Sequence, residues 1–188
     1  MERLVFWANN FETVYQGDSL AIPWEGDPFA GKSVLEIGPG GGRQFIVASR
    51  KASRYAVADI SKEAIDVDLY KDIKRYLIHD YNQDLRDRFE IIHFWYVLHH
   101  VKRSELGDFC KFIYRHLIPG GRAIFNTPVT DYPEAAYGDN GILTTRWNLE
   151  EVRKGFETVL SIVSVIRVWK NSTGYVITVE RDKLINGI

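Results

Sequence analysis

The feature that most constrains the fold is a short apolar run, SVLEI at residues 33–37, which ends in the turn Gly38-Pro39-Gly40-Gly41-Gly42. The run predicts a buried strand, and residues 43–51 can continue as a helix. Glycines let the backbone turn sharply and approach a ligand closely. The free N–H groups at the start of the next helix favour an anionic group. This arrangement is typical of an open α/β sheet that binds a ligand at its carboxyl edge.

The alternation of strand and helix continues along the chain. Further strands are predicted at 54–60, 75–80, 89–95 and 122–128, and helices at 62–71, with Ser61 as N-cap, and at 103–117. Alternating elements predict a parallel sheet covered by helices on both faces. The nearly continuous apolar character of the strands agrees with this, because parallel strands are buried on both sides.

The two ends of the chain have different patterns. We expect an amphipathic helix at 2–16, a long loop at 129–146 and a helix near 148–157. Strands at 159–169 and 174–180 follow so closely that they should form an antiparallel pair. The prediction is one domain over residues 1–188: helix and lid (1–30), cofactor-binding core (31–128), substrate-side loop (129–147), and C-terminal helix and hairpin (148–188).

Composition limits the classes of function. A length of 188 residues with 45% apolar and 26% charged residues suits one soluble domain. The net charge of −1 gives no overall attraction to nucleic acid or to an anionic membrane. No signal peptide or membrane span is evident, so we expect a cytoplasmic protein. The single Cys110 excludes an internal disulfide, and neither the histidines nor the acidic residues show metal-site spacing, so no metal is predicted.

Two acidic residues indicate the kind of cofactor. Asp59 lies about twenty residues beyond Gly38, at the end of the second strand, where a carboxylate can bind both hydroxyls of a ribose. The dinucleotide fingerprint G-x-G-x-x-G is not met, because its sixth position is Arg43. Glu36 would repel a pyrophosphate but would attract the ammonium and sulfonium groups of S-adenosylmethionine. Charge therefore favours the sulfonium cofactor over a nicotinamide dinucleotide.

Five motifs in order along residues 30–128 resemble the class I S-adenosylmethionine-dependent methyltransferases of the small type 11/12 kind. They are VLEIGPGGGRQ (34–44), YAVADIS (55–61), HDYNQDL (79–85), FEIIHFWYVLHHV (89–101) and LIPGGRAIFNTP (117–128). The resemblance implies a Rossmann-like α/β fold with seven strands in the order 3-2-1-4-5-7-6, mostly parallel, with strand seven antiparallel. One departure is Glu90, at a position where the family usually has Asp.

The resemblance also implies which residues bind the cofactor. Glu36, Gly38 and Gly40 would line the methionine part, and Asp59 would hold the ribose. Asp80 and Tyr81 would lie by the adenine, and the backbone near Trp95 would face the methionine amino group. The full predicted cofactor set is Glu36, Gly38, Gly40, Asp59, Ile60, Asp80, Tyr81 and Trp95.

Aromatic residues in the predicted lids suggest a planar or apolar small-molecule acceptor. The substrate-side candidates are Trp24, Tyr96, His100, Tyr132, Tyr137 and Trp147. Trp95 and Tyr96 stand where the family often has small or polar residues, so they either narrow the pocket, stack on a flat substrate, or pack in the core. His100 matches a position where many members have a structural histidine. No catalytic base is nominated.

The leading hypothesis is a methyltransferase that acts on a small molecule by in-line transfer and forms S-adenosylhomocysteine. The alternative is a non-catalytic protein that binds the cofactor and serves as a regulatory or partner subunit; Trp95 blocking the acceptor space would support it. The absence of an appended nucleic-acid module, and of the Asn-Pro-Pro-aromatic signature after strand four, disfavours nucleic acid. We expect a monomer or homodimer.

Overall fold

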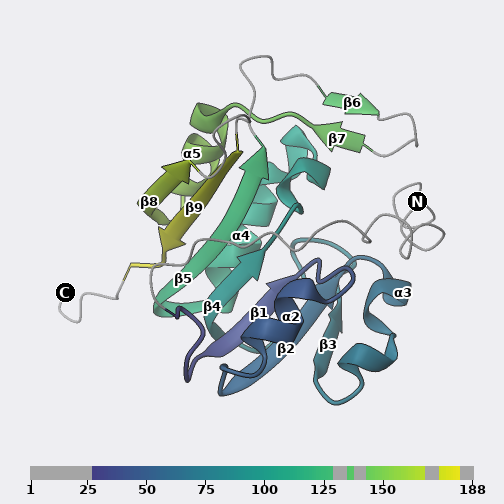
Figure 1. Ribbon diagram of the computed structural model, residues 1–188. Helices are drawn as coiled ribbons and strands as arrows, with labels where there is room; N and C mark the ends of the chain where they lie inside the picture. The colour runs from purple at the N-terminus through teal and green to yellow at the C-terminus, as the bar shows by residue number, and fades with distance from the viewer. Residues whose placement is uncertain (1–26, 129–134, 138–142, 168–173, 183–188) are drawn as a thin grey trace.

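The computed structural model describes residues 27–128, 135–137, 143–167 and 174–182 (Figure 1). The strands of its main sheet are β1 (Ser33–Ile37), β2 (Arg54–Asp59), β3 (Lys74–Leu77), β4 (Phe89–Phe94), β5 (Leu117–Pro128), β8 (Ser161–Arg167) and β9 (Gly174–Glu180). Their order is β3-β2-β1-β4-β5-β9-β8. Strands β3, β2, β1, β4 and β5 run parallel to one another, whereas β9 runs antiparallel to both β5 and β8. The predicted fold class is confirmed.

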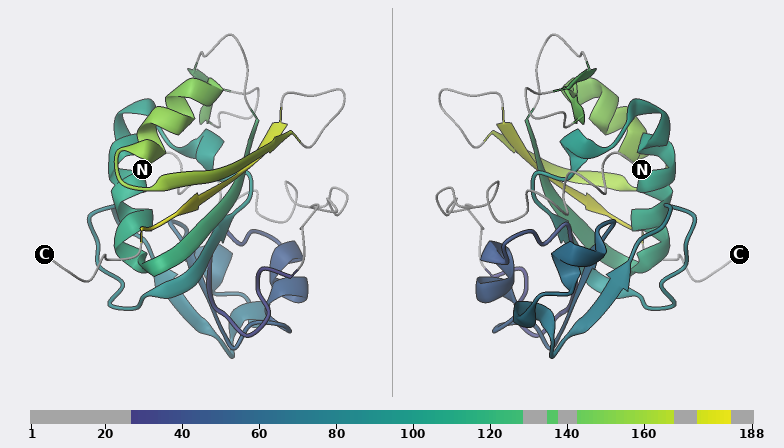
Figure 2. Two further views of the ribbon diagram at one scale, coloured as in Figure 1. Left: turned by 90° about the vertical axis from the view of Figure 1, so that its left-hand side faces the viewer. Right: turned by 90° about the vertical axis from the view of Figure 1, so that its right-hand side faces the viewer.

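Helices cover both faces of this sheet. They are α2 (Arg43–Ala48), α3 (Lys62–Ile65), α4 (Leu106–His116) and α5 (Leu149–Glu157), with the 3-10 turns η1 (Asp68–Tyr70), η2 (Leu98–His100) and η3 (Arg103–Glu105). Figure 2 shows α4 and α5 on one face and α2 on the other. Each face has its own apolar cluster, because successive residues of a strand point to opposite sides. On β1, Val34 belongs to one cluster, and Leu35 and Ile37 belong to the other.

The predicted helix at 62–71 is wrong in its second half. Ser61 caps α3 as expected, because its Oγ accepts from Ala64 N at 3.3 Å. The helix ends at Ile65, since Val67 has an extended backbone (φ −91°, ψ 153°), and the separate turn η1 follows. This break brings the fully buried Tyr70 against Phe45 of α2 at 5.2 Å between ring centroids.

Two other predicted boundaries also change. The expected loop at 129–146 contains β6 (Ala135–Tyr137) and β7 (Leu143–Thr145), which pair antiparallel and satisfy each other's backbone groups. Strand β5 begins at Leu117 rather than at residue 122, because Gly120 N donates to Arg181 O and Arg181 N donates to Gly121 O. The predicted helix at 2–16 lies outside the described residues.

His116 joins the loop after β3 to α4. Its Nε2 accepts a hydrogen bond from Leu85 N at 3.0 Å, so the ring's proton is on Nδ1, which donates to Phe112 O at 2.7 Å. The side chain is fully buried, and burial lowers its pKa. The folded state therefore favours the neutral ring.

This histidine predicts a pH dependence of stability. A group whose pKa is lower in the folded state contributes its full stability above its unfolded pKa, about 6.5, and loses it as the pH falls. We expect the free energy of unfolding to decrease between pH 7 and pH 5. His116→Gln should make this decrease smaller. Burial also lowers the pKa of His93 and of His99 to about 3, whereas the raised pKa values of Asp59, about 6, and Glu36, about 8, act in the opposite direction in both proteins. Urea denaturation followed by tryptophan fluorescence measures both slopes, and equal slopes would contradict the assignment.

Candidate active site

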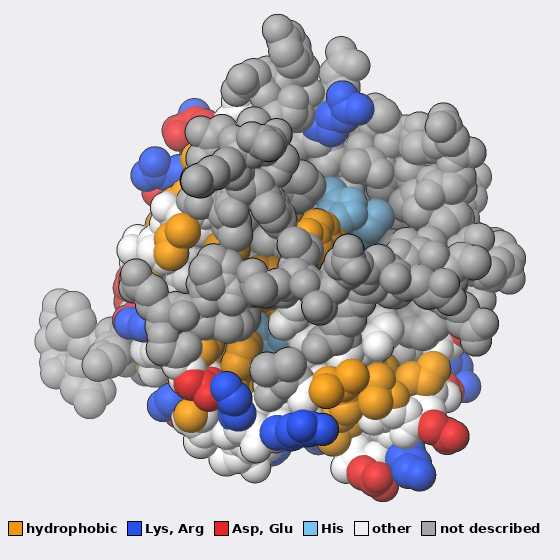
Figure 3. Space-filling model, viewed as in Figure 1, with side chains coloured by type: hydrophobic (Ala, Val, Ile, Leu, Met, Phe, Trp, Pro, Cys, Tyr) orange, Lys and Arg blue, Asp and Glu red, His pale blue; other side chains and the backbone are white. Residues whose placement is uncertain are grey.

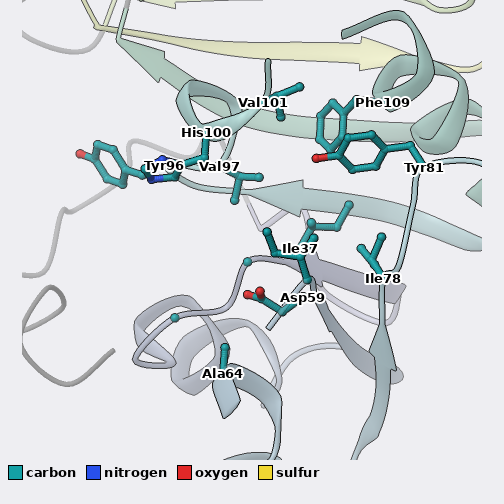
Figure 4. Close-up of a pocket in the computed structure, with 13 residues that line it drawn as sticks. Ile37, Asp59, Ala64, Ile78, Tyr81, Tyr96, Val97, His100, Val101 and Phe109 are labelled. Carbon is teal, nitrogen blue, oxygen red and sulfur yellow. The ribbon is translucent and has the colours of Figure 1, made fainter. Parts of the chain in front are cut away.

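A pocket opens at the carboxyl edge of the sheet, beside the point where the strand order reverses between β1 and β4 (Figure 4). The empty space within the pocket and its open mouth has a volume of about 630 Å³. Open α/β sheets bind ligands at this place. Its lining is mostly apolar: Ile37, Gly38, Gly40, Asp59, Ile60, Ala64, Ile78, Tyr81, Tyr96, Val97, His100, Val101 and Phe109.

The glycine turn packs tightly against the loop after β4. Gly38 has φ +66°, and a Cβ added there would lie 2.4 Å from Val97 Cγ2, so no side chain fits. Its N–H donates to Ala58 O at 2.8 Å, which ties the turn to β2. Tyr70 supports the turn from the other side, since its hydroxyl donates to Gly40 O at 3.0 Å. Gly38 and Gly40 both line the pocket.

Asp59 is a polar side chain at the floor of this apolar pocket (Figure 4). Its Oδ1 accepts from Ser61 N at 2.8 Å, a bond that fixes the carboxyl group at the end of β2. Burial raises the pKa of Asp59 to about 6, against the lowering effect of that backbone bond. At neutral pH the group is mainly an anion, and a carboxylate there can accept hydrogen bonds from hydroxyl groups of a ligand.

Two aromatic rings form the wall near β3. Tyr81 contacts Phe109 edge to face, with 5.1 Å between ring centroids, and both rings line the pocket. Arg115 donates to the backbone oxygen of Tyr81 and holds the loop against α4. Together with Ile78 these rings make an apolar wall against which an aromatic ring system can pack.

Tyr96 and His100 lie together at the other end of the pocket (Figure 4). Tyr96 has φ +55°, which is rare for a residue with a side chain and costs free energy. Its N–H donates to Oδ1 of the buried Asn126 at 2.7 Å, which holds this conformation. The rings of His99 and His100 are 3.9 Å apart between centroids. Histidine side chains reach the surface on the face seen in Figure 3, beside hydrophobic ones.

The pocket brings together seven of the predicted residues. They are Gly38, Gly40, Asp59, Ile60 and Tyr81 of the cofactor set, and Tyr96 and His100 of the substrate-side set. Six lining residues were not predicted: Ile37, Ala64, Ile78, Val97, Val101 and Phe109. Val97 and Val101 belong to the motif after strand four and could have been found there. Phe109 lies on α4, and no local pattern indicates that it reaches the pocket.

Three predicted cofactor residues do not line the pocket. Asp80 is exposed, and its Oδ1 accepts from Asn82 N at 2.6 Å in a local turn. Glu36 and Trp95 are buried and hydrogen-bond to Tyr55 and His93 respectively. Tyr55 belongs to the apolar cluster of the opposite face of the sheet, as does Trp95.

Of the remaining substrate-side candidates, the structure describes the side chain of Trp147 alone. Trp147 is buried in the core, where its Nε1 donates to Leu98 O at 2.9 Å and the Arg103 guanidinium lies 5.6 Å from its ring centroid. Trp24 and Tyr132 lie outside the described residues. Tyr137 is described only as part of the backbone of β6.

None of the described helices has both the length and the apolar character that crossing a membrane requires. Within the described ranges, no three histidine, cysteine or acidic side chains form a group that could hold a metal ion.

The close approach at Gly38 predicts a steric requirement for glycine. Gly38→Ala should destabilise the fold by about 2–4 kcal/mol, because backbone strain adds to the clash with Val97. Gly31→Ala is the matched control, since Gly31 has a similar φ of +69° but nothing within 4 Å of the added Cβ. It should cost only about 1–2 kcal/mol. Chemical denaturation measures both values, and equal losses would show that contact with Val97 is unimportant.

Comparison with known proteins gives the family. The family model described as a methyltransferase domain matches residues 18–177. No match was found among proteins of curated function.

Solved structures with the same fold include the 1,6-didemethyltoxoflavin-N1-methyltransferase of Burkholderia thailandensis, with bound 1,6-didemethyltoxoflavin and S-adenosylhomocysteine (TM-score 0.67, 18% identity, 82% of this chain and 72% of that one). The N-methyltransferase NodS of Bradyrhizobium japonicum, in complex with S-adenosylhomocysteine, has a TM-score of 0.61 at 17% identity over 80% of this chain and 79% of that one. An S-adenosylmethionine-dependent methyltransferase of Clostridium acetobutylicum has a TM-score of 0.64 at 14% identity over 95% and 92% of the two chains. The chain therefore belongs to the methyltransferase domain family, and its fold is the one that S-adenosylmethionine-dependent methyltransferases share.

Proposed function

We propose that this protein transfers the methyl group of S-adenosylmethionine to a small-molecule acceptor bound in the pocket. The observation that carries the proposal is the meeting of Gly38, Asp59 and Tyr81 in one pocket at the switch point of the sheet. These residues come from three separate motifs of the methyltransferase family. Together they would offer a backbone surface to the methionine part, an anionic hydrogen-bond acceptor to the ribose and an aromatic wall to the adenine.

The residues of the pocket fit this cofactor. Gly38 and Gly40 of the glycine turn line the pocket, so their backbone would face the methionine part. The Asp59 carboxylate would accept hydrogen bonds from the ribose, and the surface of Tyr81, Phe109 and Ile78 would hold the adenine. The cofactor supplies a methyl group already activated by the sulfonium. The work left to the protein is alignment and exclusion of water. Roles for Glu36, Asp80 and the backbone near Trp95 stay predictions.

The acceptor would bind at the end of the pocket formed by Tyr96 and His100. Both side chains carry polar groups and lie away from Asp59, and Val97 and Val101 beside them are apolar. Such a surface suits a small planar or apolar molecule that makes few polar contacts. The flat heterocycle bound to the Burkholderia thailandensis enzyme supports this class of acceptor.

The competing reading is a non-catalytic cofactor-binding protein. Its expected support was a Trp95 side chain that blocks the acceptor space. In the structure Trp95 packs with Val57 and Ile91 on the far face of the sheet and does not line the pocket. That observation favours catalysis.

The cofactor assignment predicts the effect of removing the carboxylate. Asp59→Ala should weaken binding of S-adenosylmethionine by about 1–3 kcal/mol, the range for losing hydrogen bonds to a charged group. The control is Asp72→Ala, which removes an exposed carboxylate just before β3, at the opposite edge of the sheet. Isothermal titration calorimetry gives both affinities. Unchanged affinity in the Asp59 variant would refute the assignment.

The acceptor assignment predicts a different pattern. Tyr96→Phe and His100→Ala should lower turnover by about tenfold or more, while the affinity for S-adenosylhomocysteine changes less than about threefold. The assay follows S-adenosylhomocysteine formation with a panel of amine, phenol and carboxylate acceptors. Equal losses of turnover and of cofactor affinity would place these side chains on the cofactor side instead.

A further inference from the structure

Four buried polar side chains lie behind the pocket, on the opposite face of the sheet. They are Glu36 of β1, Tyr55 of β2, His93 of β4 and Trp95 just after β4, each at most 9% exposed. Glu36 and His93 are direct neighbours in the pairing of β1 with β4. Tyr55 reaches both of them from β2. Polar groups in the middle of a buried sheet cost free energy unless they are paired, so their arrangement calls for an explanation.

The hydrogen bonds among these side chains run in one direction. The Trp95 indole N–H can only donate, and it donates to His93 Nδ1 at 3.0 Å. The proton of the neutral imidazole is therefore on Nε2, which donates to the Tyr55 hydroxyl at 2.7 Å. That hydroxyl in turn donates to Glu36 Oε2 at 2.8 Å. We call these four residues the relay. Each donor has an acceptor, and the series ends at the Glu36 carboxyl.

Both ends of the relay adjoin the residues that shape the pocket. Glu36 precedes Ile37 and Gly38, while Trp95 precedes Tyr96 and Val97, and these four neighbours all line the pocket. The contact between Gly38 and Val97 leaves no room for a Cβ, so a small relative shift of the two loops would change the pocket. Apolar packing alone is non-directional and would permit such a shift, whereas hydrogen bonds require particular distances and angles.

We propose that the relay positions the glycine turn and the loop after β4 against each other and thereby sets the affinity of the pocket for its cofactor. Tyr55 and His93 are then positioning residues that never touch the ligand. Phe29, whose ring centroid lies 5.0 Å from that of His93, covers the relay and helps to keep water out. The inference rests on the cofactor part of the proposed function and does not depend on the acceptor.

The test compares the removal of two tyrosine hydroxyls. Tyr55→Phe breaks the relay, whereas Tyr76→Phe removes a hydroxyl that binds Asp87, a residue that also pairs with Lys74 and Arg54 at the amino ends of β3 and β2. Tyr55→Phe removes both hydrogen bonds of the hydroxyl, and we expect it to raise the dissociation constant for S-adenosylhomocysteine roughly three- to tenfold. Tyr76→Phe should leave it unchanged. Calorimetry is done well below the melting temperature of each variant, so that loss of stability alone has no effect on the result.

A conservative variant separates hydrogen bonding from charge. Glu36→Gln keeps an oxygen that can accept from Tyr55, so a role through the relay alone predicts an affinity within about twofold of the wild type. A direct attraction between Glu36 and the ammonium of the cofactor predicts a larger loss instead. Glu36→Leu leaves the Tyr55 hydroxyl without its acceptor and should match Tyr55→Phe. The proposal is overturned if Tyr55→Phe binds like the wild type, or if Tyr76→Phe loses as much. Absence of binding by the wild-type protein would instead contradict the proposed function itself.

Nitrogen-15 NMR of the wild-type protein tests the role of the relay even if the variants do not fold. The relay requires His93 to be neutral with its proton on Nε2, and addition of S-adenosylhomocysteine should shift the His93 ring and Trp95 indole signals. His116, which is neutral with the opposite tautomer and does not line the pocket, is the internal control. A different tautomer of His93, or signals that do not respond while binding occurs, would overturn the proposal.

Discussion

Burial of the central strands on both faces is the constraint on which the other features of this protein depend. Strand β1 pairs with β2 and β4, and apolar side chains cover it from both sides. Water cannot reach this region, so every polar side chain there needs a partner within the protein. Asn126 binds the backbone of Tyr96, and His93 binds Tyr55 and Trp95. The hydrogen bonds of Asn126 and His93 thus hold the carboxyl ends of the strands in place.

The pocket forms where strand pairing stops, and its chemistry reflects the same burial. A carboxylate in apolar surroundings is costly, which is why the pKa of Asp59 is raised to about 6. Glu36 shows a stronger effect on the other face, where burial raises its pKa to about 8. A ligand that offers hydroxyl groups to Asp59 offsets part of that cost. Relief of the burial cost of the Asp59 carboxylate therefore adds to the affinity for such a ligand.

The sequence predicts the strands of the sheet and about half of the residues that line the pocket, because both depend on the local spacing of apolar residues and glycines. Gly38 and Asp59 were found because each lies at the carboxyl end of a buried strand, and the ends of parallel strands meet at one edge. Glu36 was expected at the cofactor, yet it alternates with Leu35 and Ile37 and so points to the other face. Trp147 was expected in a lid, but it donates to Leu98, forty-nine residues away along the chain. Such long-range packing leaves no local pattern, and neither does the extended Val67 that ends α3.

The two ends of the pocket are held by different means, and this bears on how acceptor choice can vary. Asp59 ends β2 and Gly38 directly follows β1, so their positions change only if the sheet changes. Tyr96 instead has a strained backbone, and its N–H donates to Asn126 of β5. Substitutions at Tyr96 or His100 can alter the acceptor end without disturbing the pairing of β1 with β2 and β4. Under the proposed assignment, the acceptor end can therefore vary while Gly38 and Asp59, and with them the methyl donor, keep their places.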